Sequence, residues 1–179
     1  LMLKAGELDE GLGILAKVRS ELSEEADNLR RLMSGLRPPL LEERGLIPAL
    51  RETVGRFGRD NHVHTEFSGR TSGEIPQDLE TLAYRVVQEA LSNIRKHARA
   101  SQVLIVLKRS RNGVEVEVSD DGSGFDPVNE PNLQSERHVG LRIMRERADR
   151  IGGECEISSE PGKGARVRLV LPNKHAEAS

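Results

Sequence analysis

The sequence predicts an α+β domain in which helices cover one face of a mixed sheet, preceded by part of a helical bundle. Strand and helix patterns are grouped along the chain rather than alternating as βαβ units, which favours an α+β sandwich. Leucine recurs every seven residues at Leu15, Leu22, Leu29 and Leu36, which is typical of a bundle or coiled-coil seam. A long helix that packs only on its own domain is the alternative.

The downstream elements are predicted in order from their hydrophobic spacing. Pro38 and Pro39 end the heptad helix, because proline lacks the amide hydrogen that a helix interior needs. A shorter helix over 46–59 and a polar strand over 62–67 follow, and then a long helix over 76–98. An apolar stripe at helical spacing is expected to place this long helix on the core: Leu79, Leu82, Ala83, Val86, Val87, Ala90, Leu91 and Ile94.

The second half of the chain supplies most of the predicted sheet. Valine and glutamate alternate over 114–118, which indicates a strand with one buried and one exposed face. Residues 126–138 are polar, contain two prolines and show no periodicity, so we expect a mobile loop. A helix over 140–151 is ended by a Gly-Gly pair. Strands are expected over 101–109, 113–119, 154–159 and 165–171.

Composition narrows the range of possible functions. The 179 residues fit one domain, or one domain with an appendage. A net charge of -2 and an aromatic content of 2% disfavour nucleic-acid binding. The apolar runs are too short to span a bilayer, so we expect no membrane contact by this segment. Cys155 is expected to be a small buried strand residue. We expect a cytoplasmic protein, or the cytoplasmic part of a membrane-bound sensor.

The helix over 76–98 carries a group of polar residues along one edge. Glu89 and Asn93 are four residues apart, and Lys96 and His97 follow three and four residues later. At this spacing the four side chains project near one another, at the rim of the apolar stripe. A carboxylate, an amide, an ammonium and an imidazole in this arrangement suit hydrated Mg²⁺ and phosphates.

Asp120, Gly122 and Gly124 form a turn at the end of a predicted strand. The carboxylate can accept a hydrogen bond from an exocyclic amino group, which favours adenine over guanine, and the glycines let the backbone approach the ring. Gly140 and Leu141 are expected to open a helix, whose free N–H groups suit phosphate. The turn at 161–164 is by itself a simple hairpin turn. Each motif alone is weak, but their order indicates a nucleotide site.

This order of motifs resembles the GHKL (Bergerat) ATPase superfamily, specifically the ATP-binding domain of sensor histidine kinases. Residues 88–98 are similar to its N box, 120–124 to its G1 box and 140–141 to its G2 box. Similarity to the HisKA_3 subfamily, which includes nitrate- and oxygen-responsive sensors, is found at 36–40, 45–50 and 144–148.

The resemblance implies a two-layer GHKL sandwich of mixed sheet and helices, divided along the chain in a definite way. Residues 1–39 would be partial dimerisation and histidine-phosphotransfer helices, and 40–172 the catalytic ATP-binding domain. Residues 173–179 would be a disordered tail. ATP and Mg²⁺ are the implied cofactors.

The resemblance also implies a role for each matching residue. Asn93 would coordinate Mg²⁺ that bridges the phosphates, Lys96 and His97 would contact the phosphates, and Asp120 would bind the adenine amino group. Glu89 matches the general base of ATP-hydrolysing members, but in a kinase it would position metal or water, because activating water would waste ATP. For Lys96 a solvated charge, and for His97 a structural histidine, are alternatives as well supported as a phosphate contact. The pocket and lid hinges would be shaped by Gly122, Gly124, Gly140, Leu141 and Gly164.

A histidine kinase of this subfamily needs an acceptor histidine in a His-Asp motif on its first dimerisation helix. None of His62, His64, His97, His138 and His175 stands in such a context. We therefore expect the acceptor upstream of this chain, and no autophosphorylation by the truncated chain alone. The intact kinase would form a homodimer and pass the phosphate to the receiver domain of a response regulator.

Two other functions remain open from the sequence. An anti-sigma-factor serine kinase shares the same boxes, but it lacks the long heptad helix and the Leu-Arg-Pro-Pro linker at 36–39. A nucleotide-binding regulatory module without turnover is the second. It is favoured by Ala165, which stands where relatives usually carry threonine after Gly164, so a hydroxyl is expected to be missing from the ATP pocket.

Overall fold

The computed structural model describes residues 37–70, 74–110, 113–126 and 136–172. The chain divides into two compact units, Leu1–Pro38 and Pro39–Ser179. The heptad seam, most of the expected mobile loop and the tail over 173–179 lie outside the described residues. The assignment of 1–39 to dimerisation helices therefore stays a prediction.

The second unit contains helices and strands close to those expected from the sequence. In chain order they are α2 (Pro39–Arg44), α3 (Leu46–Asn61), β1 (His64–Arg70), α4 (Gln77–Asn93), η1 (Ile94–Ala98), β2 (Gln102–Ser110), β3 (Gly113–Asp120), α5 (Glu136–Arg150), β4 (Glu154–Ser159) and β5 (Ala165–Pro172).

The strands form one mixed sheet in the order β1-β2-β3-β5-β4. β1 and β2 are parallel, and the other neighbouring strands are antiparallel. The mixed sheet expected from the sequence is confirmed. The expectation that βαβ units are absent is wrong at one place, because α4 connects the parallel strands β1 and β2.

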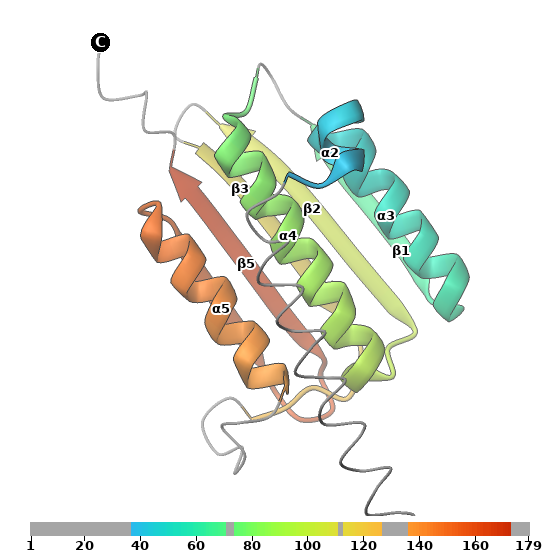
Figure 1. Ribbon diagram of the computed structural model, residues 1–179. Coiled ribbons are helices and arrows are strands. Elements are labelled where there is room, and N and C mark those ends of the chain that lie inside the picture. Colours follow the sequence, from blue (N-terminus) through green and yellow to red (C-terminus); the bar gives the residue numbers. More distant parts are fainter. Residues whose placement is uncertain (1–36, 71–73, 111–112, 127–135, 173–179) are drawn as a thin grey trace, which may run out of the picture. The chain divides into compact units, whose positions relative to one another are not determined.

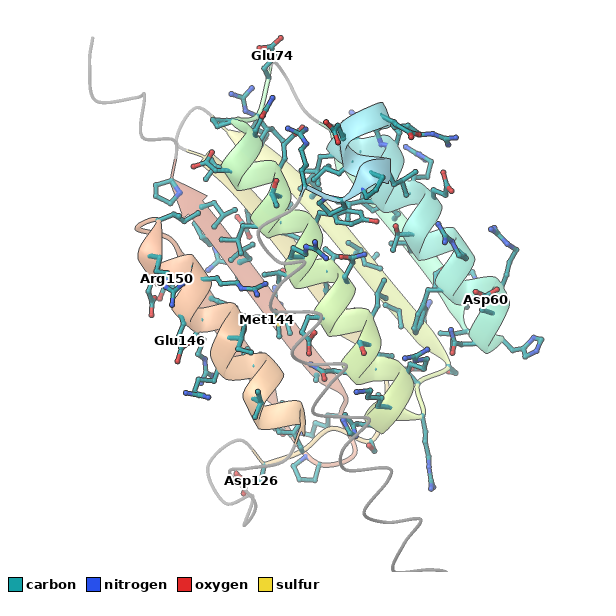
Figure 2. All side chains as sticks on the ribbon, viewed as in Figure 1. Asp60, Glu74, Asp126, Met144, Glu146 and Arg150 are labelled. Carbon is teal, nitrogen blue, oxygen red and sulfur yellow. The ribbon has the colours of Figure 1, made fainter. Side chains whose placement is uncertain are left out.

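Helices α3, α4 and α5 lie side by side over one face of the sheet (Figure 1). The apolar stripe predicted for α4 is buried at every position. On α5, Met144 lies on the inner side, whereas Glu146 and Arg150 lie on the outer side of the helix (Figure 2). The domain is therefore a two-layer sandwich whose core lies between the helices and the sheet.

The opposite face of the sheet carries charged residues at the alternate positions. Val114, Val116 and Val118 are buried, as predicted, and the intervening glutamates point outward. Glu115 forms an ion pair with Arg168 at 3.0 Å. Pairs of this kind on an exposed face contribute little because water and salt screen them, so the buried valines dominate the stability of this strand.

Three boundaries differ from those expected. β1 begins at His64, because His62 takes a left-handed conformation, with φ of 55°, and caps α3 through its N–H to Gly58 O. The last turn of the long helix, Ile94–Ala98, is π-helical. α5 begins at Glu136, so Gly140 lies inside the helix. The expectation that Gly140 opens a helix with free N–H groups is therefore wrong.

Cys155 is a free cysteine on β4, and it is buried, as its position in an alternating strand predicted. No helix among the described residues is both long enough and apolar enough to cross a membrane.

Candidate functional site

Helix α4 and its π-helical end place the first polar motif. The buried stripe of α4 holds the helix against the sheet, and Asn93 and His97 lie near its C-terminal end. The π-helical turn begins directly after Asn93. Such wide turns are rare in proteins overall. Those that occur are often found at functional sites, because they change the direction of the side chains that follow.

The loop after β3 is attached to this helix end. The last carbonyl groups of a helix have no partners within the helix. Here Ala98 O accepts the N–H of Ser123 at 2.7 Å, and His97 O accepts the Ser123 hydroxyl at 3.2 Å. Within the loop, Gly122 N–H donates to Asp120 Oδ1 at 2.8 Å. The two sequence motifs therefore form one connected unit.

Two neighbouring aspartates in this loop have different surroundings. Asp121 Oδ1 accepts the backbone N–H groups of Ser101 and Gln102, each at 2.8 Å, and the hydrogen bond from the Ser101 hydroxyl is the main cause that lowers the pKa of Asp121. Asp120 is half-buried, and burial is the main cause that raises the pKa of its carboxyl above the ordinary value. Asp121 thus fastens the start of β2, while Asp120 faces the interior.

The turn between β4 and β5 packs closely against the same loop. Gly124 and Gly164 have positive φ angles of 58° and 77°. A Cβ atom on Gly124 would collide with Glu160 O, and one on Gly164 would collide with Asp120 O. Only glycine meets both requirements, because it tolerates positive φ and has no side chain.

These segments enclose a cavity with an empty volume of about 490 Å³, part of which is open to solvent. Its wall is mostly apolar, and its few polar groups include the carboxylate of Asp120. Guanine would turn a carbonyl oxygen toward a carboxylate where adenine turns an amino group. The lining residues are Ala90, Asn93, Ile94, His97, Ala98, Val118, Asp120, Ser123, Gly124, Phe125, Leu141, Ile157, Ala165 and Val167.

Five of the residues expected at the site line this cavity: Asn93, His97, Asp120, Gly124 and Leu141. They come from the continuous helix α4–η1, from the end of β3 with the loop after it, and from α5, three segments that are separated in the sequence and meet only in the fold. Gly122 and Gly164 are not in the wall, but each contacts Asp120 and supports its position.

Glu89, Lys96 and Gly140 lie outside the lining of the cavity. Lys96 is exposed. Glu89 is half-buried on the side of α4 that faces α5, and a Cβ atom on Gly140 would collide with Glu89 Oε1. Glycine at this interior helix position costs about 1 kcal/mol relative to alanine, and it leaves room for the Glu89 carboxylate beside α5.

The side chain of Asn93 is the cavity group that could meet a divalent cation arriving with phosphates: its amide nitrogen would donate to a phosphate oxygen, and its Oδ1 would face the metal. Asn93 Nδ2 is buried and has no hydrogen-bond partner among the described residues, so the amide has bonding capacity left. Mg²⁺ prefers oxygen ligands and is usually bound by one or two protein oxygens together with substrate phosphates. The residues that would hold it are Asn93 and, one helical turn earlier, Glu89.

Several cavity residues were not assigned to the site from the sequence, and two of them carry an aromatic or a polar side chain. Phe125 and Ser123 both line the cavity. The available signal for Phe125 was an aromatic residue directly after the glycine turn, in a chain with only three phenylalanines. Ser123 gave no signal, because its role depends on carbonyl groups at the end of a distant helix.

Residues 78–175 match the family described as histidine kinase-, DNA gyrase B-, and HSP90-like ATPase. This match covers more than half of the chain. The chain belongs to this ATPase family. Its second unit is an ATP-binding domain of the sensor histidine kinase kind, as the resemblance implied.

Curated relatives of this ATPase domain are bacterial sensor kinases. The signal transduction histidine-protein kinase/phosphatase DegS of Brevibacillus brevis is 31% identical over 166 residues, which cover 92% of this chain and 42% of the relative. The oxygen sensor histidine kinase NreB of Staphylococcus carnosus is 33% identical over 165 residues, which cover 92% of this chain and 47% of the relative. The chain therefore spans less than half the length of these relatives.

Solved structures of similar ATPase domains support the fold. The ATP-binding domain of PrrB from Mycobacterium tuberculosis has a TM-score of 0.52 and 26% identity, covering 69% of this chain and 93% of that one. The blue-light activated histidine kinase of Erythrobacter litoralis has a TM-score of 0.65 and 23% identity, covering 83% of this chain and 49% of that one. The second likeness concerns the fold alone.

Proposed function

We propose that this domain binds Mg·ATP in the cavity and transfers the γ-phosphoryl group to a histidine outside the chain. The observation that carries the proposal is that Asn93 and Asp120, from motifs far apart in the sequence, line one mostly apolar cavity. The first residue type suits a metal–phosphate group and the second suits adenine.

Each cavity residue has a role in this proposal. Asp120 accepts a hydrogen bond from the amino group of adenine, and the apolar wall that includes Phe125 and Leu141 holds the ring. The phosphates extend toward Asn93 and His97, and Lys96, which is exposed on the same π-helical turn as His97, would contact them from outside the cavity wall. When bound, Mg²⁺ neutralises charge on the phosphates.

The reaction requires little covalent chemistry from the protein. The bond between the γ-phosphorus and the oxygen that leads to the β-phosphate breaks, a bond from that phosphorus to a histidine ring nitrogen forms, and ADP leaves. The protein contributes by positioning the two reactants and by stabilising charge. Glu89 lies against α5 at Gly140 and serves as an anchor for metal or water rather than as a base.

The partners follow from the same proposal. A histidine outside the chain receives the phosphoryl group, and the receiver domain of a response regulator then takes it onto an aspartate. The intact protein acts as a homodimer in the cytoplasm. The relatives support this assignment, since both are named as histidine kinases.

The test is phosphotransfer to a separate partner. The chain is mixed with γ-labelled ATP, Mg²⁺ and a second polypeptide that carries the first dimerisation helix of the intact protein. We expect acid-labile, base-stable label on the histidine of that helix, and none when Asn93 is replaced by alanine. Acid-stable label on serine would support the serine kinase instead. No label on any acceptor would contradict the kinase assignment.

A nucleotide-binding module without turnover is the second candidate. It is favoured by Ala165, which lines the cavity and offers no hydroxyl to the ligand. Saturable binding of an ATP analogue together with no transfer to the supplied helix is the result that would favour it.

A further inference from the structure

Ser159, the last residue of β4, joins two loops that border the cavity. Its Oγ accepts the N–H of Phe125 at 2.9 Å and donates to Gly164 O at 2.7 Å. One hydroxyl thus satisfies a backbone donor in the loop after β3 and a backbone acceptor in the turn before β5. Both groups lie outside strands, so no sheet ladder pairs them.

Further contacts hold the same two loops together. Gly162 N–H donates to Ser123 O at 2.7 Å. Gly124 approaches the turn so closely that a Cβ atom would collide with Glu160 O. The two loops contact each other through backbone atoms, and the Ser159 hydroxyl adds a side-chain hydrogen bond at the Phe125 N–H.

This bridge lies directly behind the cavity wall. Phe125 and Ala165 line the cavity, whereas Ser159 does not. Ser159 is paired with Ala165 across the β4–β5 ladder, so the two side chains lie on the same face of the sheet. Movement of the Ser159 hydroxyl would therefore move both the aromatic wall and the turn beside it.

We propose that Ser159 is a positioning residue for nucleotide binding, because its hydroxyl fixes Phe125 and Gly164 and so preforms the wall against which adenine packs. The identity of the ligand in this inference rests on the proposed function, whereas the hydrogen bonds of Ser159 to Phe125 and Gly164 do not. The serine acts through Phe125 and touches no substrate. A preformed wall strengthens binding because the loop does not have to be ordered when the ligand arrives.

The chain offers a matched control in the neighbouring serine. Ser158 lies on the same strand, is exposed, and points to the opposite face of the sheet. Three variants are compared with the wild type: Ser159→Ala, Ser159→Thr and Ser158→Ala. The dissociation constants of a non-hydrolysable ATP analogue and of ADP are measured, together with hydrogen exchange at the Phe125 amide and unfolding in urea.

We expect Ser159→Ala to weaken both nucleotides by about three- to tenfold, the factor that one hydrogen bond carries. Threonine retains the hydroxyl, so Ser159→Thr should bind within about twofold of the wild type, and Ser158→Ala should be unchanged. The Phe125 amide should be protected in the wild type and in Ser158→Ala, and should exchange faster in Ser159→Ala. Rescue by threonine distinguishes positioning from a general loss of packing.

Several results would overturn the inference. Nucleotide binding by Ser159→Ala within about twofold of the wild type would do so, as would a threonine variant as weak as the alanine variant. Rapid exchange of the Phe125 amide in the wild type would also do so, even if Ser159→Ala failed to fold. The proposed function and the hydrogen-bond bridge can be separated. If the wild type bound neither nucleotide, the proposed function would be contradicted. If the Phe125 amide was still protected only in proteins with a hydroxyl at position 159, the bridge itself would be confirmed.

Discussion

Replacing Asp120 and Asp121 separately with asparagine should have opposite consequences for binding and stability. The two carboxylates are adjacent in sequence and the substitutions are chemically identical. Asp120 lines the cavity, whereas Asp121 accepts hydrogen bonds from Ser101 and Gln102 at the start of β2. The pair is therefore a matched comparison of a binding residue with a structural one.

The effect on binding follows from one charged hydrogen bond. Asp120→Asn weakens the acceptor for the adenine amino group and removes the charge, which carries about 1.5–3 kcal/mol in a bond of this kind. At about 1.4 kcal/mol for each factor of ten, the dissociation constant of ATP should rise by about one to two orders of magnitude. Asp121→Asn should leave it within about twofold of the wild type.

For stability the larger effect is expected from the Asp121 substitution and not from the Asp120 substitution. Burial raises the pKa of Asp120, so its stabilising effect is present below the pKa of the unfolded chain and is lost as pH rises through the folded pKa. Its charge therefore destabilises the fold at neutral pH, and Asp120→Asn should not lower the free energy of unfolding there. The Ser101 hydrogen bond lowers the pKa of Asp121, so its contribution is present at neutral pH and is lost as pH falls below about 4.

Titration with a fluorescent ATP analogue gives the dissociation constants, and urea unfolding at pH 7 and pH 3 gives the stabilities. We expect Asp120→Asn to lose binding and retain stability, and Asp121→Asn to retain binding and lose about 1 kcal/mol at pH 7. Equal loss of binding in the two variants would refute the assignment of the inward carboxylate to adenine. So would a loss below about twofold in Asp120→Asn.

Three further perturbations test other parts of the site and the fold. Asn93→Ala should raise the dissociation constant of the ATP analogue at least tenfold in Mg²⁺ and little in its absence, measured by calorimetry; an equal change in both conditions would contradict the metal role. Ala165→Thr should tighten ATP binding by about two- to tenfold, since it adds a hydroxyl to the cavity wall; no change would show that the missing hydroxyl is unimportant. Burial raises the pKa of the Cys155 thiol to about 11, so its stabilising effect is present below the unfolded pKa and lost as pH rises toward 11. Wild type should therefore lose more stability than Cys155→Ala between pH 8 and pH 11 in urea unfolding, and parallel curves would contradict this.

Local periodicity was sufficient to predict most of the fold. The stripe on α4 recurs at helical spacing and is buried, and the valines of β3 alternate with exposed glutamates. Both patterns are written in neighbouring residues and need no knowledge of the tertiary structure. A mixed sheet was predicted, but the local patterns did not indicate that β1 and β2 are its parallel pair.

The errors arose where distant contacts decide the local structure. Gly140 resembled a helix start, but α5 begins earlier, at Glu136, and Gly140 lies inside it. The π-helical turn at Ile94–Ala98 has no residue signature of its own. The sequence alone gave no sign of these features, because they depend on which helix comes to lie beside which.

The sequence predicted part of the site as well. The spacing of the motifs singled out Asn93 and Asp120, and the fold brings both to one cavity. Phe125 and Ser159 were not predicted, because their hydrogen bond joins residues that lie 34 positions apart in the sequence. Motifs thus located the residues that would touch a ligand, whereas the residues that hold them in place required the structure.

A titration of the wild-type chain with a non-hydrolysable ATP analogue, followed by amide chemical shifts with and without Mg²⁺, tests the nucleotide site most directly. We expect saturable binding that Mg²⁺ strengthens, with shifts gathered around Asn93, Asp120, Phe125 and Leu141. No saturable binding, binding indifferent to Mg²⁺, or shifts confined to the charged outer face of the sheet would contradict the assignment of this cavity to Mg·ATP.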